Sequence, residues 1–211
     1  SRVAHWFVES DFSSLILPVD LDTGHPPFFS LYLAITWKLF GKSLVVSHLA
    51  MLPFAFGIFW QLLKLAKRFF PAEKIPYLLV LFTLEPTLLA QSTMISYEIP
   101  LVFLYLLGIN NILSEKRVLL FITVLFLGLI SLRGIVAAGA LGLTDVCYQI
   151  FIRKRLSIKI ILPYFFAFTV GFLWLLFHYK ATGWWLITPS KNWNDQRHFV
   201  SLLEMIKNAG I

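Results

Sequence analysis

The stretch Asp22-Thr23-Gly24-His25-Pro26-Pro27, followed at once by the apolar run from Phe28 to Phe40, is the most informative part of this sequence. Two ionisable side chains and a rigid Pro-Pro step stand directly before a hydrophobic segment. Most of the chain that follows consists of long apolar runs that are typical of membrane-spanning helices. A polar turn at such a boundary is where a membrane protein would hold a charged headgroup.

The composition excludes an ordinary soluble domain. The 211 residues are 58% hydrophobic and 14% charged, with a mean hydropathy of +0.78, whereas soluble proteins average about half apolar and a quarter charged residues. Several apolar runs reach or approach the roughly 18–20 residues that span a bilayer core. Inside hydrocarbon every backbone N–H and C=O needs a partner, which favours helices. We therefore expect an all-α fold: a polytopic transmembrane helical bundle of about six spanning helices, with an interfacial helix in the first outer loop.

The hydropathy pattern divides the chain into three parts. We expect a first extracytoplasmic loop with a membrane-surface helix over 1–43, a transmembrane bundle over 44–179 and a second extracytoplasmic loop over 180–211. The candidate spanning segments are 44–68, 76–93, 98–113, 117–133, 134–152 and 158–179.

The basic residues predict the orientation. They cluster in three of the expected turns, and all three turns fall on one face if each segment crosses the membrane once. Because cytoplasmic loops carry an excess of Lys and Arg, we expect that face to be cytoplasmic. It holds ten basic and three acidic residues, a net charge of +7, whereas the opposite face holds eight of each. Such clusters are typical of topology and of contact with anionic lipid, so we expect no nucleic-acid partner. The clusters are Lys64, Lys67, Arg68 and Lys74; Lys116 and Arg117; and Arg153, Lys154, Arg155 and Lys159.

The run 28–40 is short for a spanning helix, and Lys38 interrupts its end. Apolar runs of about 10–14 residues are more often interfacial or re-entrant. We therefore expect residues 26–41 to form a helix along the outer surface. Pro26 and Pro27 would lie in its first turn, where missing N–H groups cost little, and Gly41 would end it.

Ionisable side chains gather on the predicted outer face. At membrane depth such groups are costly and usually face the bundle interior or a wet cavity. Glu98 and Arg133 are therefore candidate functional residues, although each could instead snorkel to the interface, or the two could form a structural pair. Asp20, Asp22 and His25 precede the surface helix, where a solvated loop and a capping role are the alternatives. Asp22 and His25 are only two candidate metal ligands, which do not define a metal site.

Part of this pattern resembles a known family. The residues from Asp22 to Phe29, and Trp37-Lys38-Leu39-Phe40-Gly41 after them, are similar to the first outer loop of the C-type (GT-C) membrane glycosyltransferases. The likeness is greatest to the protein O-mannosyltransferase and aminoarabinose transferase superfamily, whose loop reads as an acid, His-Pro-Pro and a surface helix ending in Leu-Phe-Gly. It continues through the basic turn 64–70 and through Tyr97-Glu98-Ile99-Pro100-Leu101, where the family usually has an Asp-Pro-Leu-like step.

The resemblance implies a transferase that uses a polyprenyl-phosphate sugar as donor. It implies a multi-pass protein, of the bacterial cytoplasmic membrane, with its active site on the extracytoplasmic side beneath the first loop. The acceptor is a protein, lipid or glycan, and the sugar is left open. No cofactor follows from the resemblance, and a divalent metal is left open.

The chemistry of sugar transfer assigns roles to the candidate residues. A weak nucleophile needs a positioned carboxylate as general base, and the lipid-phosphate leaving group needs a cation. We therefore expect Asp22 and Glu98 to be catalytic, and Arg133 or Arg197 to contact the phosphate. The expected substrate-binding residues are Asp20, His25, Arg133 and Arg197.

The family also has features that this sequence does not contain. Its acidic motif after the first membrane helix would lie before Ser1, and its further helices and C-terminal domain would follow Ile211. We therefore expect a fragment that lacks its N-terminus and C-terminal part and is inactive by itself.

Two other classes of function remain open from the sequence. A transporter or lipid flippase would carry out no bond chemistry and would show inverted repeats and helices broken at mid-membrane. A non-catalytic membrane scaffold would carry outer acids that do not converge on one cavity.

Overall fold

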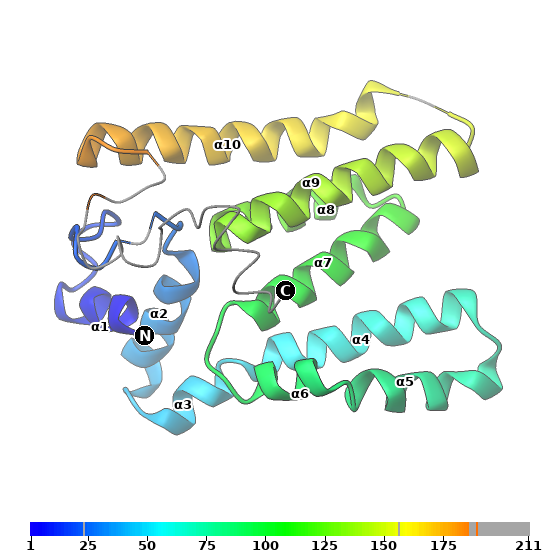
Figure 1. Ribbon diagram of the computed structural model, residues 1–211, viewed down its shortest axis with the longest axis horizontal. Helices are drawn as coiled ribbons and strands as arrows, with labels where there is room; N and C mark the ends of the chain where they lie inside the picture. Colours follow the sequence, from blue (N-terminus) through cyan, green and yellow to red (C-terminus); the bar gives the residue numbers. More distant parts are fainter. Residues whose placement is uncertain (23, 156, 186–188, 190–211) are drawn as a thin grey trace, which may run out of the picture.

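A computed structural model describes residues 1–22, 24–155, 157–185 and 189, and all regular secondary structure in these residues is helical (Figure 1). The elements are α1 (Arg2–Glu9), α2 (Phe28–Phe40), α3 (Leu44–Leu49), α4 (Leu52–Phe69), η1 (Ala72–Lys74), α5 (Ile75–Thr83), α6 (Pro86–Ser92), α7 (Glu98–Leu113), α8 (Arg117–Ile130), α9 (Leu132–Cys147), the π-helical turn η2 (Tyr148–Ile152) and α10 (Ile158–Thr182).

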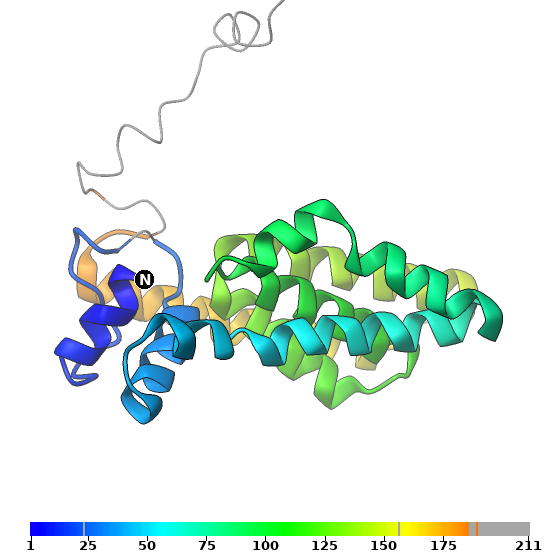
Figure 2. The ribbon, with the colours of Figure 1, turned by 90° about the horizontal axis from the view of Figure 1, so that it is seen from below.

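The long helices run side by side along the long axis of the molecule. In Figure 1, α4, α7, α8, α9 and α10 follow this axis, whereas α2 runs across it at one end, where α1 and α3 also lie. Figure 2 shows α1, α2 and α3 at the same end from a second direction. α8 packs against both α7 and α10, and α7 packs against α4. These contacts place α7 and α8 in the centre of the bundle.

The all-α class predicted from the sequence is confirmed in the described residues, where three or four helical stretches are long and apolar enough to cross a membrane and about six spans were expected. Three helical stretches qualify, Leu44–Phe69, Leu132–Ile152 and Ile158–Thr182. The bent pair Ala72–Thr83 and Pro86–Ser92 makes a fourth if it forms a single span. The apolar helices α2, α7 and α8 are shorter.

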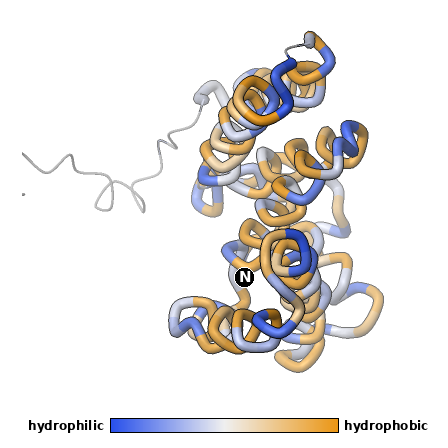
Figure 3. The backbone as a smooth tube through the Cα atoms, turned by 90° about the vertical axis from the view of Figure 1, so that its right-hand side faces the viewer, coloured by the Kyte–Doolittle hydropathy of each residue, from blue (hydrophilic) through white to orange (hydrophobic). Residues whose placement is uncertain are grey.

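The surface of these helices suits a membrane. Hydrophobic residues make up most of the helical bundle in Figure 3, and many large apolar side chains are exposed. On α10 they include Phe165, Phe172 and Leu173. A soluble monomer rarely exposes so much contiguous apolar surface, so these faces are suited to contact with lipid.

Buried polar side chains join the central helices. Asn110 donates from Nδ2 to the Oε1 of Gln61 at 3.1 Å, which links α7 to α4. Asn111 donates to the hydroxyl of Thr123 at 3.2 Å, which links α7 to α8. Amide and hydroxyl side chains commonly hydrogen-bond between helices in membranes, and here they fix the register of α7 against both neighbours.

The segment expected as one span over 76–93 is broken. Glu85 caps α6 by accepting hydrogen bonds from the backbone N–H groups of Thr87 at 3.1 Å and Leu88 at 2.6 Å. Pro86, at the first position of α6, has no N–H to continue the preceding helix. The cap and the proline together start a new helix, which is bent by 59° from α5.

The boundary expected at residues 133 and 134 lies instead at Ser131. This residue is extended (φ −167°, ψ 166°), and its hydroxyl accepts a hydrogen bond from the N–H of Gly134 at 3.2 Å. A serine cap of this kind begins a helix. Arg133 therefore belongs to the first turn of α9 and does not lie in the turn between two spans.

The helix expected along the outer surface is present with nearly the expected bounds. α2 follows Pro27 and ends at Gly41, whose φ of +87° suits glycine. The indole N–H of Trp37 donates to the hydroxyl of Ser47 at 2.8 Å, and Phe28 packs edge-on against Trp174 of α10. α2 is thus fixed to both the following helix and the last one.

Two further bounds differ from the expected domains. The N-terminal residues 2–9 form the helix α1, capped by the Ser1 hydroxyl, where only a loop was expected. α10 continues through residues 180–182 to a left-handed Gly183 with φ of +80°, so the boundary expected at residue 180 falls inside this helix.

Candidate functional site

The three basic clusters lie together at what we call the basic end, which contains the turns 70–74, 114–116 and 153–155 (right in Figure 1). Arg68 donates to the hydroxyl of Ser114 at 3.0 Å, which ties the first turn to the second. Glu115 forms ion pairs with Arg155 and, at 3.0 Å, with Arg153, which ties the second turn to the third. The three basic clusters therefore lie together in space, as the sequence predicted.

A buried polar network lies between the helices next to these turns. The carboxylate of Asp145 on α9 is fully buried and pairs with Arg117 of α8. The same carboxylate accepts hydrogen bonds from the Tyr164 hydroxyl of α10 at 3.2 Å and from the Gln149 amide at 3.4 Å. Asp145 therefore joins three helices, and its role at this end is structural.

The opposite end, which we call the α2 end, contains α1, α2, α3 and the starts of α7 and α9 (left in Figure 1). Here Asp22 is only 2% exposed. Its Oδ1 accepts a hydrogen bond from the N–H of Gly24 at 2.9 Å, and its Oδ2 lies 2.8 Å from Nε2 of His178. A segment near the N-terminus is thereby fixed to the last turn of α10.

His178 itself is 6% exposed and is held by its neighbours on both sides. The indole ring of Trp184 packs edge-on against the imidazole, with 4.6 Å between the ring centroids. The Thr182 hydroxyl lies 3.5 Å from Nδ1 and donates to the backbone carbonyl of His178 at 2.8 Å. The imidazole plane is therefore set by α10 and by the chain that follows it.

His25 lies between the starts of α7 and α9. Its Nδ1 accepts the N–H of Leu132 at 3.4 Å, and its ring centroid is 6.3 Å from that of Tyr97. Leu132 and Tyr97 are the chain neighbours of Arg133 and Glu98. The structure thus places His25 beside both of these candidate residues.

Glu98 and Arg133 form an ion pair between the first turns of α7 and α9. The Glu98 side chain is 30% exposed and that of Arg133 is 70% exposed, so both groups reach the surface of the bundle. An exposed pair of this kind contributes about 0–1 kcal/mol to stability. The pair is thus weakly held, and both groups are accessible to a ligand.

The two remaining candidates are less informative. Asp20 is exposed in the turn before Asp22. Arg197 lies outside the described residues.

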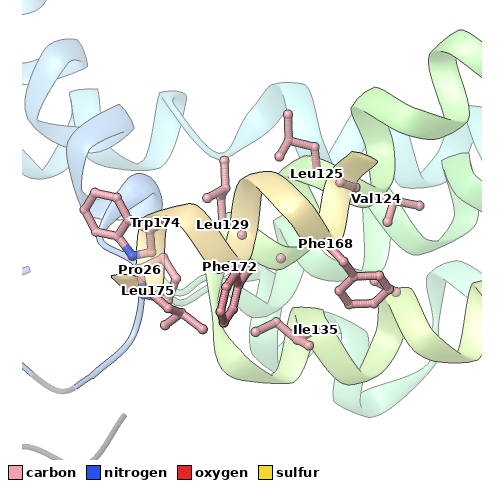
Figure 4. Close-up of a pocket in the computed structure, with 13 residues that line it drawn as sticks. Pro26, Val124, Leu125, Leu129, Ile135, Phe168, Phe172, Trp174 and Leu175 are labelled. Carbon is pink, nitrogen blue, oxygen red and sulfur yellow. The ribbon is translucent and has the colours of Figure 1, made fainter. Parts of the chain in front are cut away.

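An apolar groove with a volume of about 300 Å³ lies between α8, α9 and α10 at the α2 end, and we call it the apolar groove (Figure 4). Small residues on the three helices, Gly128, Ala138 and Gly171, make room for it. Figure 4 shows Pro26, Trp174 and Leu175 together at one end, with Val124, Leu125 and Phe168 at the other. His178 lies one helical turn beyond Trp174, so the groove ends close to the Asp22–His178 pair.

Two smaller openings contain other candidate residues. A cavity of about 90 Å³ is lined by His25, Ser30 and Tyr97 with apolar neighbours that include Pro26, which also lines the apolar groove. Glu98 lines a separate cavity of about 280 Å³ together with Glu85. The structure therefore brings Asp22, His25, Glu98 and Arg133 to one end of the bundle but does not place them in one cavity, which is the arrangement expected of a non-catalytic membrane scaffold.

The described residues contain no group of three or more His, Cys, Asp and Glu side chains that could hold a metal ion. Asp22 has His178 as its close partner, and His25 is turned toward the backbone of Leu132. These two side chains, considered together in the sequence, do not form a common ligand set in the structure.

His178 is the site residue that the sequence did not single out. Its partner lies 156 residues away in the chain, so no local pattern connects the two. The sequence did contain one signal for His178, which is an imidazole near the end of a long apolar helix. An ionisable group at such a position is costly unless it is paired, so a partner could have been expected.

Comparisons of the chain with protein-family models, with curated proteins and with solved structures give no match.

Proposed function

We propose that this chain is the membrane-bound part of a C-type glycosyltransferase, which transfers a sugar from a polyprenyl-phosphate donor to a protein, lipid or glycan acceptor on the extracytoplasmic side. The observation that carries the proposal is the apolar groove, which ends one turn from a buried carboxylate–imidazole pair. A donor that joins one long apolar chain to an anionic headgroup matches this arrangement, in which an apolar groove ends beside polar residues.

The groove suits the apolar part of such a donor. Its volume of about 300 Å³ is at the lower end of the range found for small-molecule sites. Its lining is hydrocarbon apart from the indole of Trp174, so it offers nothing to bind a polar molecule. A prenyl chain lying there would place its phosphate at the α2 end, beside Pro26 and the polar turn before it.

The candidate residues at the α2 end can supply the groups that the reaction needs. The acceptor hydroxyl gives its proton to a carboxylate, for which Asp22 and Glu98 are the candidates. The acceptor oxygen bonds to the sugar C1, and the bond from C1 to the phosphate oxygen breaks. Arg133 stabilises the charge left on the lipid phosphate. The roles of Asp20, His25 and Arg197 are contacts with the donor.

The orientation follows from the charge of the two ends. The basic end faces the cytoplasm because Lys and Arg are retained there, and the α2 end faces the extracytoplasmic side of a bacterial cytoplasmic membrane. α2 then lies in the interface. The turns alternate between the two ends, so α4, the bent pair α5 and α6, α7, α8, α9 and α10 would give six crossings.

Transfer by the full-length protein tests the assignment of the acids. With polyprenyl-phosphate-linked sugars as donors, Glu98→Gln and Asp22→Asn should each lower turnover by about 10²–10⁴-fold, the usual contribution of a general base or of the group that aligns it. The matched control is Glu85→Gln, because Glu85 lines the same cavity as Glu98 but caps α6. Wild-type turnover in both site variants would refute the proposal.

A second function has one observation in its favour. If α5 and α6 together cross the membrane, the 59° bend between them makes this pair a broken span of the kind that transporters use to bind substrate. A lipid flippase would move a fluorescent polyprenyl phosphate between leaflets of a vesicle without breaking a bond. Movement without sugar transfer, lost on replacing Pro86 with Ala, would favour this function over the transferase.

A further inference from the structure

We propose that His178 is a positioning residue of the transferase, which holds the carboxylate of Asp22 at a fixed place relative to the donor groove. The proposal rests on the function proposed above and adds a residue that the resemblance and the sequence do not supply. It follows from three features of the α2 end.

The first feature is the complete fixation of Asp22. One oxygen accepts from Gly24 at 2.9 Å, a bond within the turn itself, and the other meets His178 at 2.8 Å. The turn bond alone would let the carboxylate move with the loop. The imidazole bond ties it to the end of α10, and each carboxylate oxygen still has a free lone pair with which to accept a proton.

The second feature is the shared helix. Trp174 and Leu175, which line the end of the apolar groove, precede His178 on α10 by one turn. The same rigid helix therefore determines where the donor chain ends and where the carboxylate lies. Displacement of a catalytic group by about 1 Å can lower a rate by about 10²-fold, so this connection has a direct effect on turnover.

The third feature is the fixation of His178 itself. Trp184 packs edge-on against the imidazole, and Thr182 lies beside Nδ1, the ring nitrogen that is not directed at Asp22. With Nε2 turned to Asp22, the tautomer that carries its hydrogen on Nε2 donates a hydrogen bond to the carboxylate. A catalytic base needs this kind of support from groups that do not themselves touch the substrate.

The test compares variants of the full-length protein in the transfer assay. His178→Phe keeps a ring against Trp184 but removes the N–H. We expect kcat to fall about 10–100-fold, as expected for loss of a hydrogen bond to a charged group, with the KM for the donor unchanged. His178→Gln restores a donor N–H and should recover most of kcat. The matched control, His5→Gln, changes a half-exposed histidine of α1 that contacts Glu9 and Lys42, and it should have no effect.

The split between kcat and KM separates positioning from a purely structural tie. A misplaced carboxylate slows the chemical step without weakening donor binding, so His178→Phe should lower kcat at an unchanged KM, and His178→Gln should restore kcat. If His178→Phe does not accumulate, His178→Met takes its place, since Met fills irregular space.

The outcomes are distinguishable. If the wild-type protein transfers no sugar, the proposed function fails and the role of His178 fails with it. If the wild type transfers sugar and His178→Phe does so at the same rate, only the positioning role is wrong. A raised KM for the donor, or a lower kcat that His178→Gln does not restore, would also overturn the positioning role and leave a structural contact.

Discussion

The two ends of this bundle use charged residues in different ways. At the basic end, Glu115 pairs with Arg153 and Arg155 in the next basic turn, and Asp145 joins α8, α9 and α10. At the α2 end, Asp22 pairs with His178 across 156 residues, beside an apolar groove. The basic end holds successive helices together, whereas the α2 end brings distant segments to an opening.

This contrast predicts that substitutions at the basic end mainly lower stability, whereas substitutions at the α2 end mainly affect function. A buried carboxylate that joins three helices cannot be removed without cost to the fold. An exposed pair such as Glu98 and Arg133 contributes little to stability, and its two groups are available to a ligand. The following predictions change one end at a time.

The largest loss of stability is expected at the basic end. Asp145→Ala leaves Arg117 without its buried partner and should lower the free energy of unfolding by about 3–5 kcal/mol. Thermal unfolding in detergent measures the change. The control is Thr144→Ala, because Thr144 is exposed and its hydroxyl donates to the carbonyl of Ala140 in its own helix. Equal stability of the two variants would contradict the structural role of Asp145.

A smaller loss is expected where α8 meets α9 at the α2 end. A Cβ on Gly134 would lie 1.7 Å from the carbonyl oxygen of Leu127, so Gly134→Ala forces the helices apart. Overpacking of this kind should cost about 1–3 kcal/mol. Gly139→Ala, on the same helix with nothing within 4 Å, should be neutral or stabilising. The same unfolding assay distinguishes them, and a stable Gly134→Ala would mean that the helices are farther apart.

The exposed pair at the α2 end should contribute little to stability. Glu98→Gln and Arg133→Gln should each change the free energy of unfolding by less than about 1 kcal/mol. Arg133→Gln should nevertheless weaken the binding of farnesyl phosphate, measured by quenching of tryptophan fluorescence. Lys180→Gln, near the end of α10, is the charge control. Unchanged binding in Arg133→Gln would exclude this arginine as the phosphate contact.

The smallest effect is the pH dependence of the basic end. The hydrogen bond from Arg155 holds the pKa of Glu115 below its ordinary value. Because the folded pKa is the lower one, the stabilisation is present above the unfolded pKa of about 4.3 and is lost as the pH falls through the folded pKa. Hydrogen exchange in the turn 114–116 should therefore rise in acid, and Glu115→Gln should remove this dependence. A variant with the wild-type pH profile would contradict the prediction.

The sequence predicted features that depend on local chemistry. The Pro-Pro step and Gly41 gave the bounds of α2, and hydropathy gave the helical class. The start of α9 at Ser131 and the break at Glu85 also have local signals, a capping serine and a carboxylate before Pro86. Hydropathy averaged over a whole segment does not register a single capping residue, so the start of α9 and the break before α6 were not predicted.

The site could be predicted only in part, because its contacts are long-range. Glu98 and Arg133 were considered as a possible pair, and they do meet. The partner of Asp22 could not be read from its neighbours, since it depends on how α10 crosses the α2 end. The separation of His25 and Glu98 into different cavities likewise depends on packing between helices far apart in sequence.

Labelling of single cysteines tests most directly whether the two ends lie on opposite sides of a membrane. In a Cys147→Ser background, Asp20→Cys reports the α2 end and Lys74→Cys reports the basic end, both at exposed positions. A membrane-impermeant maleimide applied to intact cells should label Asp20→Cys and should reach Lys74→Cys only after permeabilisation. Labelling of both in intact cells, or of Lys74→Cys alone, would contradict the account.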